Sequence, residues 1–188
     1  MSNKYYRRRC IVKFIGFFII SILIIVSDQY TKHLAVENLK NQPPHILIKD
    51  VLLLRYLENT GAAWGIFGGK IHIFTPFTIL LVLILLYIVF KIEKVLSTLD
   101  NKRAAIVLQW VLISLISGAL GNFIDRIRLG YVVDFIYFKI IDFPTFNVAD
   151  CFVVISTAIL LYLLLIGIKD TDWDRILSLK KSGGESVE

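Results

Sequence analysis

The chain is poor in the residues that hold metal ions and form disulfide bonds. Its 188 residues include two cysteines and three histidines. The histidines are scattered at His33, His45 and His72 and form no H-E-x-x-H motif, which excludes the zinc site of a large class of metalloproteases. The sequence contains no internal repeat and nothing that resembles a nucleic-acid-binding module, so neither a repeat architecture nor a nucleic-acid partner is predicted.

Charge is also missing from long stretches of the chain. The sequence is 56% hydrophobic with a mean hydropathy of +0.70, whereas soluble domains are nearer ~45–50% apolar. Four continuous apolar runs lie at about 10–27, 71–90, 104–124 and 148–168. Each approaches the ~20 residues that cross a ~30 Å hydrocarbon core as a helix. Because lipid offers the backbone no hydrogen bonds and the runs do not alternate as barrel strands do, we expect a single all-α integral membrane domain over 1–188 with four transmembrane helices.

The distribution of basic residues indicates the orientation. The net charge is +6, and basic residues concentrate at the N-terminus and in the 91–103 loop. Arg7–Arg9 and Lys102-Arg103 are the clearest clusters. Since cytoplasmic loops are enriched in Lys and Arg, both termini are predicted to be cytoplasmic, and contact with anionic membrane lipids is expected. Segments 28–70 and 125–147 are then external.

The two cysteines are predicted to remain unpaired. Cys10 belongs to the cytoplasmic end of the first helix and Cys151 to the external end of the fourth. A disulfide requires Cα atoms within ~7 Å, so a separation of one helix length excludes it. Both are expected to be ordinary buried thiols.

The first external segment changes character along its length. Pro43-Pro44 stops any helix, and the alternation in Ile46–Leu57 predicts a small β-rich segment on the membrane surface. The following 58–69 contains four glycines together with Trp64 and Phe67. This composition predicts a mobile loop that covers a site, although a simple aromatic anchor at the bilayer interface explains it too.

Four of the chain's acidic residues lie in Gly121–Asp150, between two apolar runs. A charge near hydrocarbon is costly, so such acids are candidates for function. Asp134 is flanked by Val132, Val133 and Phe135, which is unusual for a solvated loop, and Asp150 opens the fourth helix. Two adjacent carboxyl groups cannot both ionise easily, and a pair that shares a proton supplies a general base and a general acid together.

Structural explanations remain open for several of these residues. Asp28 is either a solvated residue at a membrane boundary or the partner of Lys32 in an i,i+4 ion pair. Asp125 and Arg126 could close a local polar network. Asp150 lies three residues after Asn147, as in a capping box, a role that is compatible with catalysis. The third helix also places small residues four apart, at Ser114/Gly118 and Ser117/Gly121, which allows close helix packing.

Five short motifs together resemble bacterial lipoprotein signal peptidase, also called signal peptidase II. They are D-Q-Y-T-K at 28–32, E-N-T-G-A-A-W-G at 58–65, G-N-F-I-D-R at 121–126, V-V-D-F at 132–135 and F-N-V-A-D at 146–150. Each motif alone is weak, but all five occur in the family's order at the predicted external edge. Trp64 stands where the family usually has phenylalanine, and Ser117 stands where glycine is common.

The resemblance implies a multi-pass aspartic endopeptidase of the bacterial cytoplasmic (inner) membrane, with its active site at the external face. Its substrate would be a diacylglyceryl-modified prolipoprotein, cleaved just before the lipidated cysteine. No metal or organic cofactor is implied, and globomycin-like cyclic peptides are the expected inhibitors. The catalytic pair would be Asp134 and Asp150. The residues expected to support the site or bind substrate are Asp28, Asn59, Gly61, Asn122, Asp125, Arg126 and Asn147.

A second class of function fits polar residues at a membrane edge. A proton-coupled transporter or a non-enzymatic membrane assembly factor could also use them. Transporters usually place their binding groups near the midplane. Here the middles of the second and fourth runs carry no ionisable residue, and the third has only Gln109 on its inner half.

Overall fold

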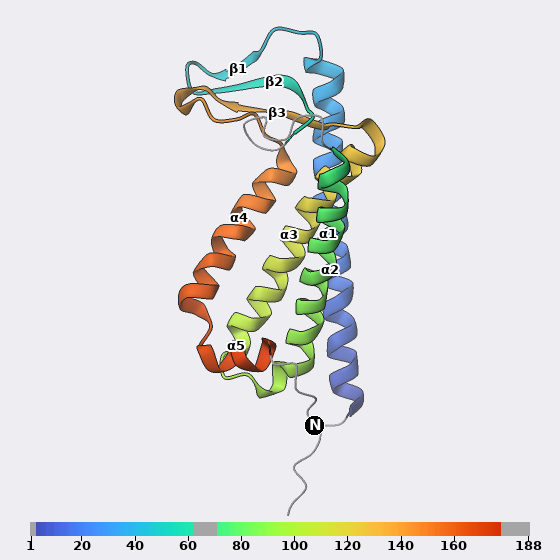
Figure 1. Cartoon of the computed structure of the whole chain (residues 1–188), viewed down its shortest axis with the longest axis vertical. Helices are drawn as coiled ribbons and strands as arrows, with labels where there is room; N and C mark the ends of the chain where they lie inside the picture. Colours follow the sequence, from blue (N-terminus) through green and yellow to red (C-terminus); the bar gives the residue numbers. More distant parts are fainter. Residues whose placement is uncertain (1–2, 62–70, 178–188) are drawn as a thin grey trace, which may run out of the picture.

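The computed structural model describes residues 3–61 and 71–177. Four long helices form a bundle: α1 (Asn3–Leu39), α2 (Ile71–Val95), α3 (Lys102–Leu129) and α4 (Val148–Tyr162), which continues as a π-helical turn, Leu163–Gly167. A small sheet crosses one end of the bundle, and the short helix α5 (Asp170–Leu177) lies at the other end (Figure 1). The architecture is mostly helical, as predicted.

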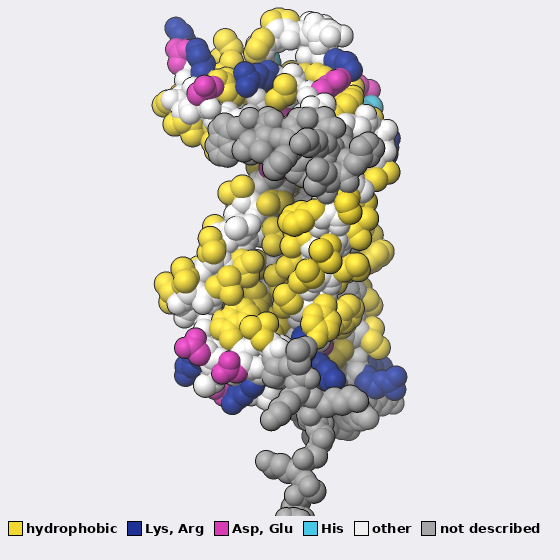
Figure 2. Space-filling model, viewed as in Figure 1, with side chains coloured by type: hydrophobic (Ala, Val, Ile, Leu, Met, Phe, Trp, Pro, Cys, Tyr) yellow, Lys and Arg dark blue, Asp and Glu magenta, His cyan; other side chains and the backbone are white. Residues whose placement is uncertain are grey.

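Three helices in the described part of the chain are long and apolar enough to cross a membrane, within Arg7–Leu39, Lys102–Leu129 and Val148–Gly167. The stretch predicted as a further span, 71–90, is helical within α2 and has Pro76 near its start. Hydrophobic side chains cover the middle of the bundle, and charged ones gather at its two ends (Figure 2). This pattern is typical of a helical membrane protein.

The sheet contains three antiparallel strands in the order β1-β2-β3. The strands are β1 (His45–Ile48), β2 (Leu52–Asn59) and β3 (Val132–Phe138), with 3₁₀ turns at Leu96–Thr98 and Lys139–Ile141. The first two strands confirm the β-rich segment predicted in 46–57. Strand β3 was not predicted from the sequence. It pairs with β2, although helices α2 and α3 lie between the two strands in the chain.

The first helix is longer than predicted. It contains 37 residues, so at ~1.5 Å per residue it spans about 55 Å, well beyond a ~30 Å hydrocarbon core. The helix continues beyond the predicted membrane span of about 10–27 and ends at Leu39, just before Pro43-Pro44. Asp28 and Lys32 are therefore helical residues held against the bundle.

α3 is the central helix. Its apolar stretch is 56% buried inside the protein, against 11% for α1 and 17% for α4. Its small residues allow the close approach that their spacing predicts. A Cβ on Gly118 would lie 2.7 Å from the backbone oxygen of Ala149, and one on Gly121 would lie 2.6 Å from Asp28 Oδ2. These contacts bring α1 and the start of α4 against the same end of α3.

Candidate active site

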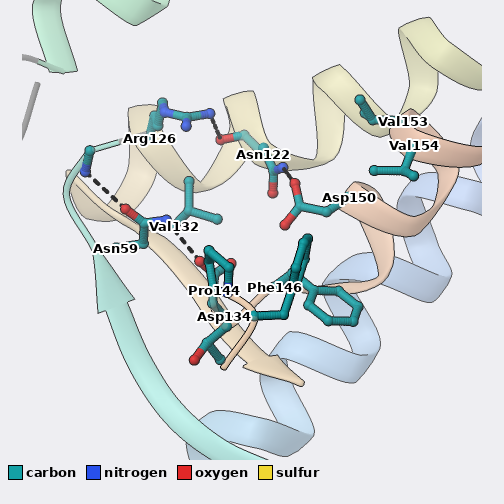
Figure 3. Close-up of a pocket in the computed structure, with 13 residues that line it drawn as sticks. Asn59, Asn122, Arg126, Val132, Asp134, Pro144, Phe146, Asp150, Val153 and Val154 are labelled. Atoms are coloured by element: carbon teal, nitrogen blue, oxygen red, sulfur yellow. Dashed lines mark hydrogen bonds between the residues drawn. The ribbon is translucent and has the colours of Figure 1, made fainter. Parts of the chain in front are cut away.

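A pocket of about 200 Å³ lies where the sheet meets α3 and α4. Asp134 of β3 and Asp150 of α4 both line it, as do Asn59, Asn122 and Arg126 (Figure 3). The other side of the pocket is apolar and includes Val153 and Val154 of α4 and Phe146. The pocket thus sets two carboxyl groups between a polar wall and an apolar one.

Asp134 is held by two side-chain amides. Asn59 Nδ2 donates to its Oδ2 at 2.8 Å, and Asn147 Nδ2 donates to its Oδ1 at 2.6 Å. The residue is only 1% exposed. Burial and the charge of Asp150 raise the pKa of Asp134 to about 7, although the two amides lower it. Asp134 can therefore carry a proton at neutral pH, which an ordinary aspartate does not.

Asp150 forms a capping box with Asn147 at the start of α4. Asn147 Oδ1 accepts the backbone N–H of Asp150 at 3.0 Å, and Asp150 Oδ2 accepts the backbone N–H of Asn147 at 3.1 Å. The other carboxylate oxygen, Oδ1, accepts Asn122 Nδ2 at 2.7 Å. The predicted capping role is confirmed, and it holds the Asp150 carboxylate at the pocket.

Asn147 links the two acids. The same amide group that donates to Asp134 also donates to Asn122 Oδ1 at 3.0 Å and to the Val133 backbone oxygen at 3.3 Å. Asn147 is fully buried. One side chain therefore fixes both carboxyl groups: Asp134 through its NH₂ group and Asp150 through the cap.

A buried lysine of α1, Lys32, contacts the residues around the two acids. Lys32 Nζ lies 2.8 Å from Asp28 Oδ2 and 2.9 Å from Asp125 Oδ2, and it donates to Asn122 Oδ1 at 2.8 Å. Asp28 in turn accepts the backbone N–H of Ala149 at 2.9 Å. The predicted Asp28–Lys32 pair is confirmed, and the alternative of a solvated Asp28 is wrong because this residue is fully buried.

Asp125 also connects α3 to β3 and α1. Its Oδ2 accepts the backbone N–H of Val133 at 3.1 Å, and its Oδ1 accepts Gln29 Nε2 at 2.8 Å. Arg126 lines the pocket and donates to the backbone oxygen of Asn122 at 3.4 Å. The local network expected around Asp125 and Arg126 is present, and it also includes Lys32 of α1, which the sequence indicated only as a partner of Asp28.

The loop predicted to cover the site is only partly described. Gly61 lines the pocket, and its backbone N–H donates to Asn59 Oδ1 at 2.9 Å, which turns the Asn59 amide toward Asp134. Trp64, Phe67 and the later glycines lie outside the described residues. Asp142 is an acid of the same region that belongs to no motif. It is exposed, lies away from the pocket and accepts the Tyr137 hydroxyl at 2.6 Å.

The fold is similar to that of solved membrane enzymes. Two structures of bacterial membrane enzymes share this fold. One has a TM-score of 0.66 and 31% identity and covers 89% of this chain and 94% of its own. The other has a TM-score of 0.65 and 33% identity, with coverages of 80% and 93%. The chain therefore has the fold of a bacterial membrane enzyme.

The family follows from sequence relatives. The family model described as signal peptidase (SPase) II matches residues 20–166, which include every predicted site residue. A lipoprotein signal peptidase of Enterococcus faecalis is 37% identical over 79% of this chain and 88% of its own length. Another, from Caldanaerobacter subterraneus, is 40% identical over 78% and 94%. The chain belongs to the signal peptidase II family, which confirms the resemblance drawn from its five motifs.

Proposed function

We propose that this peptidase removes the signal peptide from diacylglyceryl-modified prolipoproteins by cleaving just before the lipidated cysteine, with Asp134 and Asp150 as its catalytic dyad. One observation carries the proposal: the two carboxyl groups line one pocket and have unlike environments. Asp134 is buried with a pKa of about 7, while Asp150 accepts a backbone N–H at a helix start. Two adjacent carboxyl groups that share a proton can supply the acid and the base of hydrolysis.

In the mechanism we propose, Asp150 is the base and Asp134 the acid. Asp150 takes a proton from a water molecule, which attacks the scissile carbonyl carbon. Asp134 donates its proton to the leaving amine as the carbon–nitrogen bond breaks. Because the pair shares one proton, the assignment describes the resting state of a coupled dyad. Asn59, Asn122 and Asn147 hold the carboxyl groups in place, with donor–acceptor distances of 2.6–2.8 Å to the two acids.

The proposed topology matches this reaction. We place four spans across the inner membrane as one domain, with both termini and the 91–103 loop in the cytoplasm and the sheet at the external face. Water then reaches the dyad from outside. Val154 of the apolar wall is exposed on the surface of the protein. In the proposed topology it faces the bilayer, where the lipid anchor of a substrate would remain. Bilayer lipids are the other expected partners, and globomycin-like cyclic peptides would inhibit by occupying the same pocket.

The test is cleavage of a defined substrate. Purified protein in detergent should release the signal peptide from a diacylglyceryl-modified prolipoprotein, with a mass loss measured by mass spectrometry. The same prolipoprotein without the lipid is the matched control and should be cleaved far more slowly. Failure to cleave the lipidated substrate would overturn the proposal and favour a non-enzymatic role, and equal cleavage of both forms would overturn the proposed requirement for the lipid.

A further inference from the structure

Lys32 is buried beside the dyad but does not line the described pocket. It is 3% exposed, and its ammonium group contacts Asp28, Asp125 and Asn122. The residue belongs to α1, and its contact with Asn122 joins residues 90 positions apart. Any effect of Lys32 on the reaction must therefore pass through the groups that it holds.

The ammonium group determines which way the Asn122 amide faces. Lysine has only donors, so it must meet the amide oxygen of Asn122, at 2.8 Å. The NH₂ group of Asn122 then faces Asp150 Oδ1, at 2.7 Å. The reverse orientation would set an NH₂ group against an ammonium group and an oxygen against a carboxylate. Both contacts would be repulsive, so the lysine selects the orientation that supplies Asp150 with a donor.

The same choice extends to the second acid. Because Asn122 Oδ1 faces Lys32, it also accepts Asn147 Nδ2 at 3.0 Å. This bond orients the Asn147 amide with its NH₂ group toward Asp134 Oδ1 and its oxygen toward the backbone N–H of Asp150. One cation thus fixes the polarity of two amides, and those amides in turn hold both carboxyl groups.

The charge of Lys32 has an effect of its own. Lys32 lowers the pKa of Asp134, in opposition to burial and to Asp150, which raise it. The charged groups of this network are Asp28 and Lys32 on α1, Asp125 and Arg126 on α3, Asp134 on β3 and Asp150 on α4. Four carboxyl groups face two cations there. Loss of one cation should move the proton affinities of the dyad upward.

We propose that Lys32 is a positioning residue of the dyad: it orients the Asn122 and Asn147 amides toward the two acids. This inference rests on the proposed function. A purely structural ion pair would stabilise the bundle without changing the proton affinity of the site.

The test separates stability from catalysis. Lys32→Met alone leaves two buried carboxylates without their cation, which strongly destabilises the folded protein, so it is combined with Asp28→Asn. This double variant is compared with Asp28→Asn alone. Because the buried Asp125 still loses its cation, the double variant should unfold at a lower temperature, so both variants are assayed well below that midpoint. The double variant should show a kcat lower by about 10²-fold with KM changed much less, since misplaced catalytic groups cost about this much. Both limbs of its pH–rate profile should move to higher pH.

Two further measurements complete the test. Lys32→Arg keeps the charge and should leave the limbs in place even where its bulk lowers kcat. Infrared titration of the protonated carboxyl band, assigned with Asp134→Asn, should show the same upward shift in the double variant without any substrate. The infrared measurement tests the inference about Lys32 without substrate, whereas cleavage by the wild-type protein tests the proposed function. Failure of one can therefore be told from failure of the other. The inference is wrong if the kcat of the double variant equals that of Asp28→Asn. It is also wrong if the two limbs of the pH–rate profile and the titration midpoint of the carboxyl band do not shift.

Discussion

Among the described residues, two clusters of charged groups lie between the long helices, and only one of them has the features of a catalytic site. The site network contains Asp28, Lys32, Asn122, Asp125, Asp134, Asn147 and Asp150, below the sheet. The distal cluster contains Cys10, Lys13, Glu93 and Gln109, toward the opposite end. In the described part of the chain, no buried polar side-chain atom lacks a hydrogen-bond partner.

The distal cluster is balanced in charge. Lys13 of α1 pairs with Glu93 of α2, and each also bonds to Gln109 of α3 at 3.1 Å. Gln109 further donates to the backbone oxygen of Val89, and Cys10 Sγ donates to Glu93. One anion meets one cation, and the cluster joins three helices. Such interhelical polar contacts stabilise the packing of helices in membrane proteins.

The site network differs in balance and in access. Its acids outnumber its cations, and two of the acids line a pocket. Carboxyl groups in excess raise one another's proton affinity, whereas an ion pair favours the ionised forms of both partners. Burial of polar groups alone therefore does not mark a functional site. A candidate functional site is better indicated by an excess of one charge together with a pocket that the charged groups line.

The largest effect should come from the dyad. Asp134→Asn and Asp150→Asn keep shape but remove proton transfer, so each should lower kcat by about 10³-fold. The double variant should be scarcely slower than either single one, because the pair acts as a unit. Cleavage of the lipidated prolipoprotein measures this. Asp142→Asn is the matched control and should retain activity; loss in this control, or activity in either dyad variant, would show that the wrong acids were chosen.

The distal cluster should respond in stability and not in rate. Lys13→Met leaves Glu93 partly buried without its cation and should cost about 3 kcal/mol of unfolding free energy, at the low end for a broken buried pair. Replacing the pair and its neighbour together, with Lys13→Met, Glu93→Met and Gln109→Leu, should recover most of that loss. Denaturant unfolding in detergent measures both. A fall in kcat of the folded triple variant would contradict the division between the two regions.

The pH dependence should report Asp134. In our proposal Asp134 must be protonated, so cleavage should fall as the pH rises through about 7, the pKa of this residue. The sign for stability follows from the same shift. A raised carboxyl pKa in the folded state means that stability is lost as the pH rises from the unfolded value toward 7. Asp134→Asn should therefore be more stable than the wild type above pH 7, and Asp142→Asn should show no such gain.

A smaller effect is expected at Gly61. Gly61→Val places a branched side chain in the pocket lining beside the bond that orients Asn59. Turnover should fall by about tenfold, which is less than the 10²-fold cost of a misplaced catalytic group, and the unfolding midpoint should change little. Steady-state kinetics and thermal unfolding of the same preparation compare the two. Unchanged turnover would show that the loop beginning at Gly61 only connects its neighbouring elements and has no part in the reaction.

The smallest effect should come from the cysteines. Neither cysteine forms a disulfide bond within the described part of the chain, as predicted, and both are partly buried. Cys10 donates to Glu93, and Cys151 donates to the Asn147 backbone oxygen at 3.4 Å. Serine keeps these donors, so Cys10→Ser with Cys151→Ser should retain activity to within about twofold. EDTA should leave the rate unchanged as well. Complete loss in a folded double variant would point to thiol chemistry.

The sequence predicted the parts of this molecule that depend on local pattern. The apolar runs, the β-rich segment after Pro43-Pro44 and the Asn147–Asp150 cap all rest on neighbours within a few residues. Asp134 and Asp150 were identified because acids beside apolar runs are costly and because the motifs around them resemble a known family. Their common pocket is now visible in the structure (Figure 3).

The remainder depends on contacts between distant positions. Lys32 meets Asn122 across 90 positions and Lys13 meets Gln109 across 96, and no periodicity relates such residues. Lys13 and Glu93 lie at the edges of apolar runs, where charges look like ordinary boundary residues. The strand β3 was missed because its partner β2 is separated from it by two helices. Tertiary packing, and not local propensity, decides these features.

The capping box at the start of α4 also bears on how the protein is made. Asp150 is both the residue that begins the last long helix and half of the proposed pair, so the pocket stays incomplete until that helix enters the bilayer. In the proposed mechanism, a chain still emerging from the ribosome carries Asp134 without its partner acid and therefore lacks the dyad. Cleavage would then require the α4 helix to be in place beside the sheet.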